Sequence, residues 1–428
     1  MRAQRTVVSR GREISCGGCH CPGHPFCWPN HLAFVGKRSS KSDISTRYGR
    51  RGWPPSTRWF SMNQRLPVLD QAFAQEPLKT LKNRMDPDGT NLRAVGGCVR
   101  DALLGKEFGD MDFATSMGPR QIVEGATRAG FGVDLKGYDH GTVVAHRDGH
   151  AFEITSLRQD VETDGRHARI ALTDSWIEDA RRRDFTVNAL YYAPETGLID
   201  PLEGAKDLHP LTLKFIGKPK DRMKEDSLRI FRFYRFWSQW PALAVDQESL
   251  HCVEELASSI PLPSRERITT EWMGMHQQEP PEDLWTSISK SGLAERVFGH
   301  MPEHARQAHS METRLAISFA PAPEEMTDAL RLPGHVRRQV VELAQIKSAI
   351  VAQDNRLLAR RMLHASKETI TMLGKEEAIF APCIPLLSRL DDARQIGALE
   401  ARSAGLDDGP EMGKWIRKAR ADHLLGLS

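Results

Sequence analysis

One segment constrains this chain more than any other part of its sequence. It runs from Val95 to Gly105 as Val-Gly-Gly-Cys-Val-Arg-Asp-Ala-Leu-Leu-Gly. The apolar residues of Asn91–Val95 predict a strand that leads into the Gly-Gly turn, and Val99–Leu104 predict a helix that ends at the last glycine. A strand, a tight turn and a helix in direct succession are typical of a domain that mixes both kinds of secondary structure.

Two aspartates follow at a spacing that suits metal chemistry. On a strand predicted for Met111–Ala114, Asp110 and Asp112 would point to the same side. Their carboxylates repel each other unless a cation lies between them, and hard oxygen ligands suit Mg²⁺. A pair of such ions can bind both the attacking and the leaving oxygen of an in-line displacement. We therefore interpret Asp110 and Asp112 as catalytic residues and as metal ligands.

Further residues supply what a nucleoside triphosphate needs. Gly96 and Gly97 let backbone N–H groups approach phosphate closely, and the guanidinium of Arg100 pairs with phosphate oxygens. A second strand is predicted for Ala151–Ser156, where Glu153 should face away from its two apolar neighbours. We take Glu153 as a candidate third catalytic carboxylate, with a plain exposed strand face as the alternative.

A helix predicted for Asp226–Trp240 carries a charged residue at every third position. These residues are Asp226, Arg229, Arg232 and Arg235. Steps of three residues lag by about 60°, so the four side chains form a spiral edge. The remaining surface is apolar, which predicts burial, and one buried carboxylate among three guanidiniums is costly without an anionic ligand. A solvent-facing salt bridge between Asp226 and Arg229 is the alternative.

The chemistry of Asp226 and Arg229 matches two bases. A carboxylate accepts from the amino group of cytosine or adenine, while a guanidinium donates to the adjacent ring nitrogen. Uracil and guanine present the opposite pattern. Each mispaired buried group costs about 1–3 kcal/mol, so two mismatches give roughly 10²–10⁴-fold rejection. The pair therefore predicts selection of C and A.

Together these motifs resemble the polymerase-β nucleotidyltransferase superfamily, and specifically its class II branch of CCA-adding enzymes of tRNA and bacterial poly(A) polymerases. The likeness runs from about Leu92 to about Met275 and includes Arg-Arg-Arg-Asp-Phe-Thr-Val-Asn-Ala-Leu at 181–190. The resemblance implies that Arg183 binds nucleotide phosphate, while Asp184 and Asn188 hold the local geometry. It also implies that the Asp226–Arg229 helix selects CTP and ATP, with Arg232 and Arg235 contributing to the nucleotide pocket.

Other residues separate the two activities of this branch. His140-Gly141-Thr142 and Glu178-Asp179 are similar to CCA-adding enzymes, and the long basic tail common in poly(A) polymerases is absent from the sequence. Tyr191-Tyr192 depart from the commonest family pattern. The sequence favours addition of C and A from CTP and ATP to the 3′ end of tRNA, with Mg²⁺ as cofactor. Poly(A) addition and an inactive RNA-binding relative are the alternatives.

The expected fold class is α+β. A small mixed α/β head at 62–200 precedes an all-helical neck at 201–276, and a helical body and tail at 277–428 bind tRNA. An amphipathic helix is expected over Leu66–Leu81. Ser264 is expected to cap a helix that braces the neck, where Glu271 follows Arg267 by four residues.

Residues 1–61 are basic and lack hydrophobic periodicity, so we expect disorder there. Three interpretations compete: a transit peptide, a small metal knuckle built on Cys16, Cys19, Cys21, His24 and Cys27, or untranslated sequence upstream of a working start at Met62. The last is favoured.

Composition limits the remaining possibilities. The net charge is only +3, so RNA contacts must come from a local basic patch. No apolar run approaches the roughly 18 to 20 residues of a membrane span. The seven cysteines lack regular spacing, which argues against a disulfide framework and predicts a reducing, cytoplasmic location. No protein partner is indicated.

Overall fold

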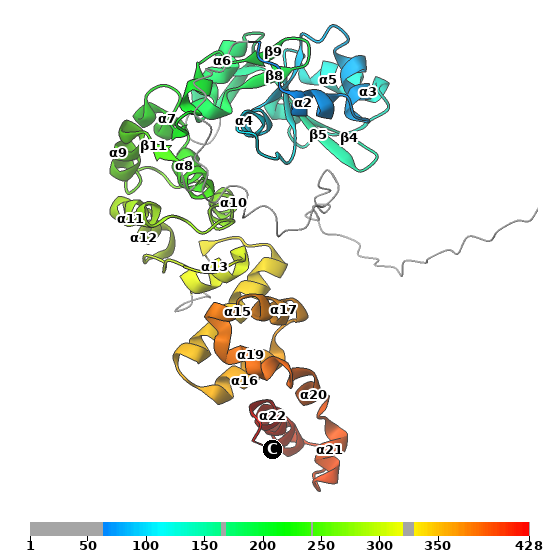
Figure 1. Cartoon of the computed structure of the whole chain (residues 1–428), viewed down its shortest axis with the longest axis vertical. Helices are drawn as coiled ribbons and strands as arrows, with labels where there is room; N and C mark the ends of the chain where they lie inside the picture. The colour runs from blue at the N-terminus through cyan, green and yellow to red at the C-terminus, as the bar shows by residue number, and fades with distance from the viewer. Residues whose placement is uncertain (1–62, 164–167, 241–242, 320–328, 428) are drawn as a thin grey trace, which may run out of the picture. The chain divides into compact units, whose positions relative to one another are not determined.

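The structure is a computed structural model that describes residues 63–163, 168–240, 243–319 and 329–427 (Figure 1). All these residues belong to one compact unit, Pro55–Ser428. The basic segment 1–61, with its three interpretations, lies outside the described residues. None of the helices in the described ranges is both long and apolar enough to cross a membrane.

A seven-stranded mixed sheet forms the centre of the N-terminal region, in the order β3-β4-β5-β2-β1-β8-β9. Its strands are β1 (Leu92–Val95), β2 (Asp112–Thr115), β3 (Gly132–Asp134), β4 (Thr142–Arg147), β5 (His150–Ser156), β8 (Tyr191–Ala193) and β9 (Gly197–Ile199). Within this sheet only β2 and β5 pair in parallel, and their register sets Asp112 opposite Glu153. Two carboxylates that lie far apart in the sequence thus lie opposite each other on neighbouring strands.

Helices accompany this sheet, and β6 (Arg158–Thr163) pairs with β7 (Ala168–Leu172) beside it. The helices are α2 (Pro67–Phe73), α3 (Leu78–Met85), α4 (Gly97–Leu103), α5 (Pro119–Arg128) and α6 (Trp176–Arg182), with short turns η1 (Tyr138–His140) and η2 (Thr186–Asn188). The core includes Phe113, which meets Phe73 and Phe152 edge to face.

Two local predictions in this region are wrong in detail. The single helix expected over Leu66–Leu81 is two helices, because Pro77 lacks an N–H and begins a new helix rather than continuing α2. The strand expected over Met111–Ala114 begins at Asp112, so Asp110 lies just before it. Asp110 belongs to the preceding exposed loop. The alternation of side chains along a strand therefore does not determine where its carboxylate points.

After residue 200 the described chain is helical except for one small two-stranded sheet. It comprises η3 (Gly204–Asp207), β10 (Thr212–Leu213), α7 (Pro219–Glu225), α8 (Leu228–Gln239), β11 (Ala244–Val245), α9 (Gln247–Leu256), α10 (Arg265–Met275), α11 (Glu282–Ser291), α12 (Leu293–Phe298), α13 (Met311–Ser318), α15 (Gly334–Val351), α16 (Asn355–His364), α17 (Lys367–Lys375), α18 (Glu377–Phe380), η4 (Ala381–Cys383), α19 (Ile384–Leu387), α20 (Leu390–Gln395), α21 (Ala398–Ser403) and α22 (Pro410–Leu425). The predicted fold class, a mixed α/β head followed by helices, is confirmed.

The helix expected over Asp226–Trp240 is also divided. Glu225 ends α7, Asp226 adopts an extended backbone, and α8 begins at Leu228. Oδ1 of Asp226 accepts the backbone N–H of Leu228 at 3.1 Å, so the aspartate precedes α8 and binds its first N–H group instead of lying within the helix.

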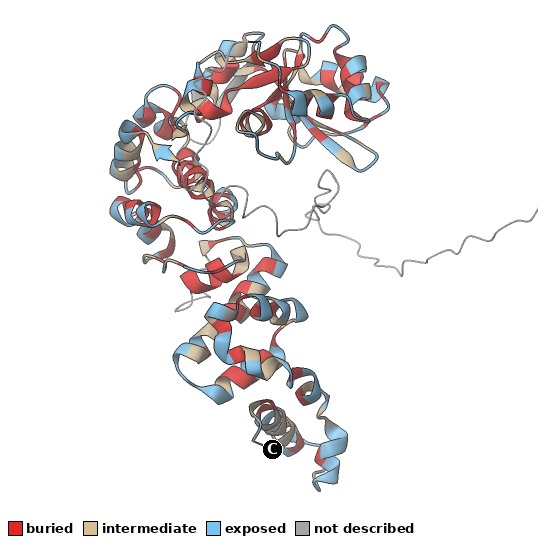
Figure 2. Ribbon diagram, viewed as in Figure 1, coloured by how far each residue is buried: buried red, intermediate tan, exposed pale blue. Residues whose placement is uncertain are grey.

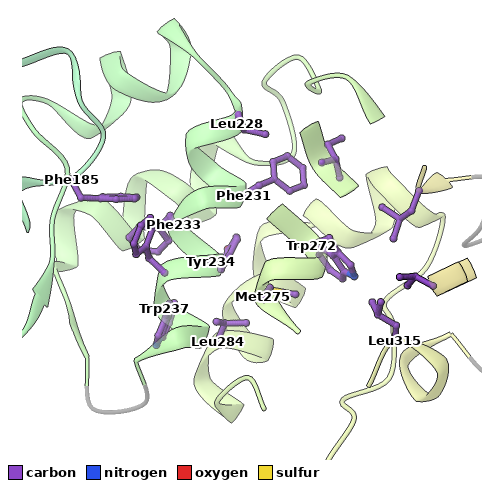
Figure 3. Close-up of a cluster of buried hydrophobic side chains, with 14 of the residues drawn as sticks. Phe185, Leu228, Phe231, Phe233, Tyr234, Trp237, Trp272, Met275, Leu284 and Leu315 are labelled. Atoms are coloured by element: carbon purple, nitrogen blue, oxygen red, sulfur yellow. The ribbon is translucent and has the colours of Figure 1, made fainter. Parts of the chain in front are cut away.

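Buried residues continue from the head into the helices that follow (Figure 2). Phe185 packs against Phe233 and Phe236 of α8, and Tyr234 stacks on Trp237. Figure 3 shows this cluster continuing through Trp272 and Met275 of α10. The charged residues of α8 are therefore held on a helix whose other sides are buried.

Candidate active site

Three carboxylates meet at the start of β2. Asp112 lies at the exposed end of that strand, opposite Glu153 on β5, and Asp110 lies two residues earlier. Partial loss of hydration, then repulsion by Glu153 and Asp110, raises the pKa of Asp112 from 3.8 to about 6, and Arg183 opposes the shift. Glu153 is exposed while Phe152 and Ile154 are buried, as its place on the strand predicted. The carboxylates are therefore close enough to repel one another.

The glycine turn lies beside two arginines. Gly96 has a φ of +74°, a conformation that side chains rarely adopt, and α4 begins at Gly97. A Cβ built on Gly96 would lie 4.0 Å from Nη1 of Arg183, and one built on Gly97 would lie 3.7 Å from Nη2 of Arg100. Both glycines therefore face guanidinium groups, as a triphosphate site requires.

Arg183 is held by a buried carboxylate on α6. Its Nε and Nη2 donate to Oδ2 of Asp179 at 3.1 and 2.9 Å, and Nε also donates to the Tyr191 hydroxyl. Oδ1 of Asp179 is taken by Arg182. Burial opposes ionisation of Asp179, but the charges of Arg183 and Arg182 lower its pKa overall. Asp179 therefore remains a carboxylate that orients Arg183.

A chain of polar contacts connects the glycine turn to α8. Nη1 of Arg100 donates to Asn188 at 2.6 Å, Asn188 donates to Asp184 at 3.1 Å, and Nε of Arg232 donates to Asp184 at 2.6 Å. Burial alone would raise the pKa of Asp184, yet the charge of Arg232 and the hydrogen bonds hold it at about 2. The expected geometric link between Asp184 and Asn188 is present, and it extends across the head to the neck.

Glu271 of α10 neutralises the arginines of α8. Its side chain is only 5% exposed and lies 3.6 Å from Arg232 and 3.1 Å from Arg235. The guanidiniums of Arg100, Arg232 and Arg235 all lie within 5.1–5.6 Å of the Phe236 ring centroid. The expectation that an anionic ligand is needed to balance these arginines is wrong, because carboxylates of other elements already balance their charge.

Asp226 and Arg229 do not pair with each other. Nη2 of Arg267 donates to Oδ2 of Asp226 at 2.7 Å. Nη1 of Arg229 instead donates to Glu225 and to the Arg222 carbonyl, at 2.7 and 2.9 Å. The alternative of an Asp226–Arg229 salt bridge is therefore wrong. The expectation that Arg267 pairs along its own helix is also wrong, although Ser264 caps α10 as predicted.

Arg229 is further tied to the head. Its Nη2 donates to the backbone carbonyl of Arg182 at 2.9 Å, and the residue is 8% exposed. Three of its five N–H donors thus have protein acceptors, which leaves two for a ligand. Reversal of its charge would remove its hydrogen bonds to two backbone carbonyls and would place a carboxylate beside Glu225.

Sequence reasoning missed several supporting residues. Asp179, Tyr191, Glu225, Glu271 and Arg267 contact predicted site residues, yet only long-range packing brings most of them there. A usable signal existed for Glu225, which precedes Arg229 by one helical turn. For Glu271 the sequence gave no such signal. A glutamate four residues after Arg267 on a short helix fits a solvent-exposed face equally well.

Comparison with known proteins supports the motif-based resemblance. Residues 92–214 match the family described as Poly A polymerase head domain. The chain is 38% identical over 275 residues to the mouse protein "CCA tRNA nucleotidyltransferase 1, mitochondrial", covering 63% of each chain. It is 31% identical over 266 residues to a CCA-adding enzyme of Oceanobacillus iheyensis, covering 58% of this chain and 65% of that one. The chain therefore spans rather less than two thirds of these curated relatives.

Solved structures share the fold. A CCA-adding enzyme of Bacillus stearothermophilus in complex with CTP superposes with a TM-score of 0.65 at 22% identity, covering 82% of this chain and 94% of that one. A Thermotoga maritima CCA-adding enzyme complexed with tRNA gives 0.58 at 16% identity, covering 86% of this chain and 96% of that one. The likeness extends well beyond the sheet into the helices.

Nucleotidyltransferases of this kind generally use a divalent metal ion. Within the described ranges, no group of three or more His, Cys, Asp or Glu side chains is arranged to hold an ion. A small hard cation needs fewer protein ligands when substrate phosphates and water complete its shell. The pKa of Asp112 is raised by partial loss of hydration and then by repulsion from Glu153 and Asp110, and a cation would offset both, so the carboxylates fit such an ion.

The order of motifs and the sheet register converge with these comparisons. The Gly-Gly turn, Asp112 and the Arg183 segment all lie inside the matched residues 92–214. Residues 92–214 therefore match the Poly A polymerase head domain family, and the chain is similar to CCA-adding enzymes.

Proposed function

We propose that the chain is a metal-dependent tRNA nucleotidyltransferase. It adds C and A from CTP and ATP to the 3′ end of tRNA without a nucleic-acid template and releases pyrophosphate. One observation carries the proposal: Asp112 and Glu153 lie opposite each other on parallel neighbouring strands near Arg183, and polar contacts lead from the glycine turn to α8. One region thus contains paired carboxylates, arginines suited to binding phosphate, and the helix proposed to read the base.

The chain's own groups would bind and orient the triphosphate. The backbone at Gly96 and Gly97 would accept close approach of the phosphates, and Arg100 and Arg183 would pair with their oxygens. Mg²⁺ held by Asp110 and Asp112 would activate the RNA 3′-hydroxyl and neutralise charge on the leaving pyrophosphate. Glu153 is the proposed third carboxylate. Attack of the hydroxyl on the α-phosphorus requires no covalent intermediate with the protein.

Asp226 and Arg229 would read the base as separately anchored groups. Both oxygens of Asp226 are oriented, one by the Leu228 N–H and one by Arg267, and each keeps a lone pair for an amino group. Arg229 is fixed by Glu225 and two carbonyls and keeps two donors. Arg232 and Arg235, held by Asp184 and Glu271, would border the same nucleotide. Such preorganisation favours cytosine and adenine over uracil and guanine.

We assign the head to 62–200, the neck to 201–276 and tRNA binding to the body and tail at 277–428. The solved relatives are described as complexes with CTP, with ATP and with tRNA. Basic residues of α16 and α22 offer phosphate-binding groups on the body and tail: Arg356, Arg360, Arg361, Lys414, Arg417 and Lys418. No protein partner is proposed.

The decisive experiment supplies radiolabelled CTP or ATP and tRNA that lacks its 3′ end. We expect the chain to add two C and one A, and the Asp110→Ala variant to lose at least about 10³-fold in rate while retaining its melting temperature. Unlimited A addition to unrelated RNA would favour a poly(A) polymerase. Near-normal incorporation by the variant would refute the metal assignment.

We propose a cytoplasmic location for the mature enzyme. The mammalian relatives carry "mitochondrial" in their names, so the transit-peptide interpretation of 1–61 needs a direct test. Residues 1–61 fused to a fluorescent protein should leave it in the cytosol. Accumulation in mitochondria would contradict the cytoplasmic location and support the transit-peptide interpretation.

A further inference from the structure

Two adjacent tyrosines, Tyr191 and Tyr192, occupy β8, where the sequence departs from the commonest family pattern. Successive strand residues point to opposite faces, and the two hydroxyls indeed have different partners. Tyr192 donates to Asp70 at 2.6 Å and accepts the Leu66 N–H at 3.0 Å, which attaches the start of α2. Tyr191 donates to Asp179 on the other face at 2.8 Å.

Tyr191 adds a second anchoring atom for Arg183. Because Arg182 occupies Oδ1 of Asp179, both Arg183 donors converge on the single oxygen Oδ2. Two donors on one oxygen fix which edge of the guanidinium faces Asp179, but the group can still swing about that oxygen. The Tyr191 hydroxyl accepts from Nε of Arg183 at 3.2 Å while donating to that same Oδ2, which closes a ring of hydrogen bonds.

The ring leaves one edge of the guanidinium available. Among the residues that the structure describes, Nη1 of Arg183 has no hydrogen-bond acceptor, and this atom faces the Gly96 turn. Tyr191 itself is fully buried, with Trp176 packed edge to face against its ring at 5.2 Å. Its hydroxyl therefore cannot rotate away to water, and its orientation fixes that of Arg183.

We infer that Tyr191 is a positioning residue for triphosphate binding, which acts by fixing Arg183 so that Nη1 points at the nucleotide phosphates. This inference rests on the proposed function, because it assigns Arg183 to the phosphates of CTP and ATP. The phosphates are common to both nucleotides, so Tyr191 contributes to affinity and not to base choice.

The test compares Tyr191→Phe with Tyr192→Phe, a matched loss of one buried hydroxyl on the same strand. We expect Tyr191→Phe to raise KM for CTP and ATP equally, about tenfold, as loss of a hydrogen bond to a charged group implies. The value of kcat and the preference for C and A over U should stay within about twofold. Tyr192→Phe should lower the melting temperature without changing either KM.

Calorimetry with inorganic triphosphate and Mg²⁺ separates this inference from the proposed function. The Kd for inorganic triphosphate should rise about tenfold in Tyr191→Phe, whether or not the wild-type chain extends tRNA. In an Arg183→Met background, the Tyr191→Phe change should have no further effect, since it acts through that arginine.

A Kd within twofold of wild type in folded Tyr191→Phe, or an equal effect in both backgrounds, overturns the inference. If Tyr191→Phe does not fold, Asp179→Asn is measured in the same way. A higher Kd for triphosphate in Asp179→Asn supports the proposed role of the hydrogen-bonded ring. An unchanged Kd, or failure of this variant to fold as well, would mean that the ring has a purely structural role.

Discussion

Asp112 couples the chemistry of the site to the stability of the head. Its pKa is raised from 3.8 to about 6 by partial loss of hydration and by the neighbouring carboxylates. An acid whose folded-state pKa exceeds its unfolded value stabilises the fold at low pH. That contribution is lost as the pH rises through the folded pKa. Without metal, ionised Asp112 should therefore destabilise the protein above about pH 6.

We expect Asp112→Asn to raise the melting temperature of the metal-free protein at pH 8 and to have little effect at pH 4. The exposed position limits the gain to about 1 kcal/mol. Added Mg²⁺ should stabilise the wild type but not the variant, while incorporation is lost. Melting curves across pH measure this, with Asp134→Asn as control, because a hydrogen bond from the Lys136 N–H lowers the pKa of that exposed acid. Equal melting of Asp112→Asn and wild type at pH 8 would count against the account.

At the scale of elements, α10 holds α8 through charge. Glu271 faces Arg232 and Arg235, and Arg267, one turn earlier, binds Asp226 at the start of α8. The first contact is buried and the second is about half exposed. Removing one partner of a buried pair leaves an uncompensated charge and typically costs about 3–5 kcal/mol. The alignment of the proposed base-reading residues therefore depends on a neighbouring helix.

We predict that Glu271→Gln lowers the free energy of unfolding by about 3 kcal/mol, because Arg232 and Arg235 lose their shared carboxylate. KM for CTP and ATP should rise as α8 loses its alignment. Glu266→Gln on the same helix is the control, since its contact with Arg331 is exposed and worth about 1 kcal/mol or less. Denaturant unfolding and steady-state kinetics measure both effects. Similar losses in the two variants would mean that Glu271 has no special role.

At the scale of the whole molecule, the hydrophobic core does not stop at the proposed end of the neck. Trp272 packs against Phe298 of α12 with ring centroids 4.7 Å apart. Nη1 of Arg314 on α13 donates to the carbonyl of His276 at 2.9 Å. The proposed boundary at 276 therefore crosses a continuous packed region.

We expect residues 62–428 alone to melt at the temperature of the full chain and to retain its kcat/KM, because the described core begins at Leu66. A fragment ending at 276 should unfold or aggregate, since it exposes Trp272 and the carbonyl of His276. Scanning calorimetry and the incorporation assay compare the three proteins. Loss of activity in 62–428 would give the basic segment a working role.

Local chemistry in the sequence determined the parts of the site that depend on neighbouring residues. The Gly-Gly turn, the strands around it and the Ser264 cap follow from backbone preferences that act over a few positions. The same locality accounts for Glu153, whose exposed side follows from strand alternation. Together with the α+β class, these features follow from the order of the amino acids alone.

Only the tertiary structure decided which carboxylates pair with the arginines of α8. Arginines at 229, 232 and 235 could be balanced by a ligand or by several carboxylates, and the sequence contains both possibilities. Packing of α8 against the head and α10 selected Glu225, Asp184 and Glu271 as those carboxylates. The physical reason is that an ion pair depends on distance and burial, which arise when distant segments meet, whereas a turn depends on its own residues.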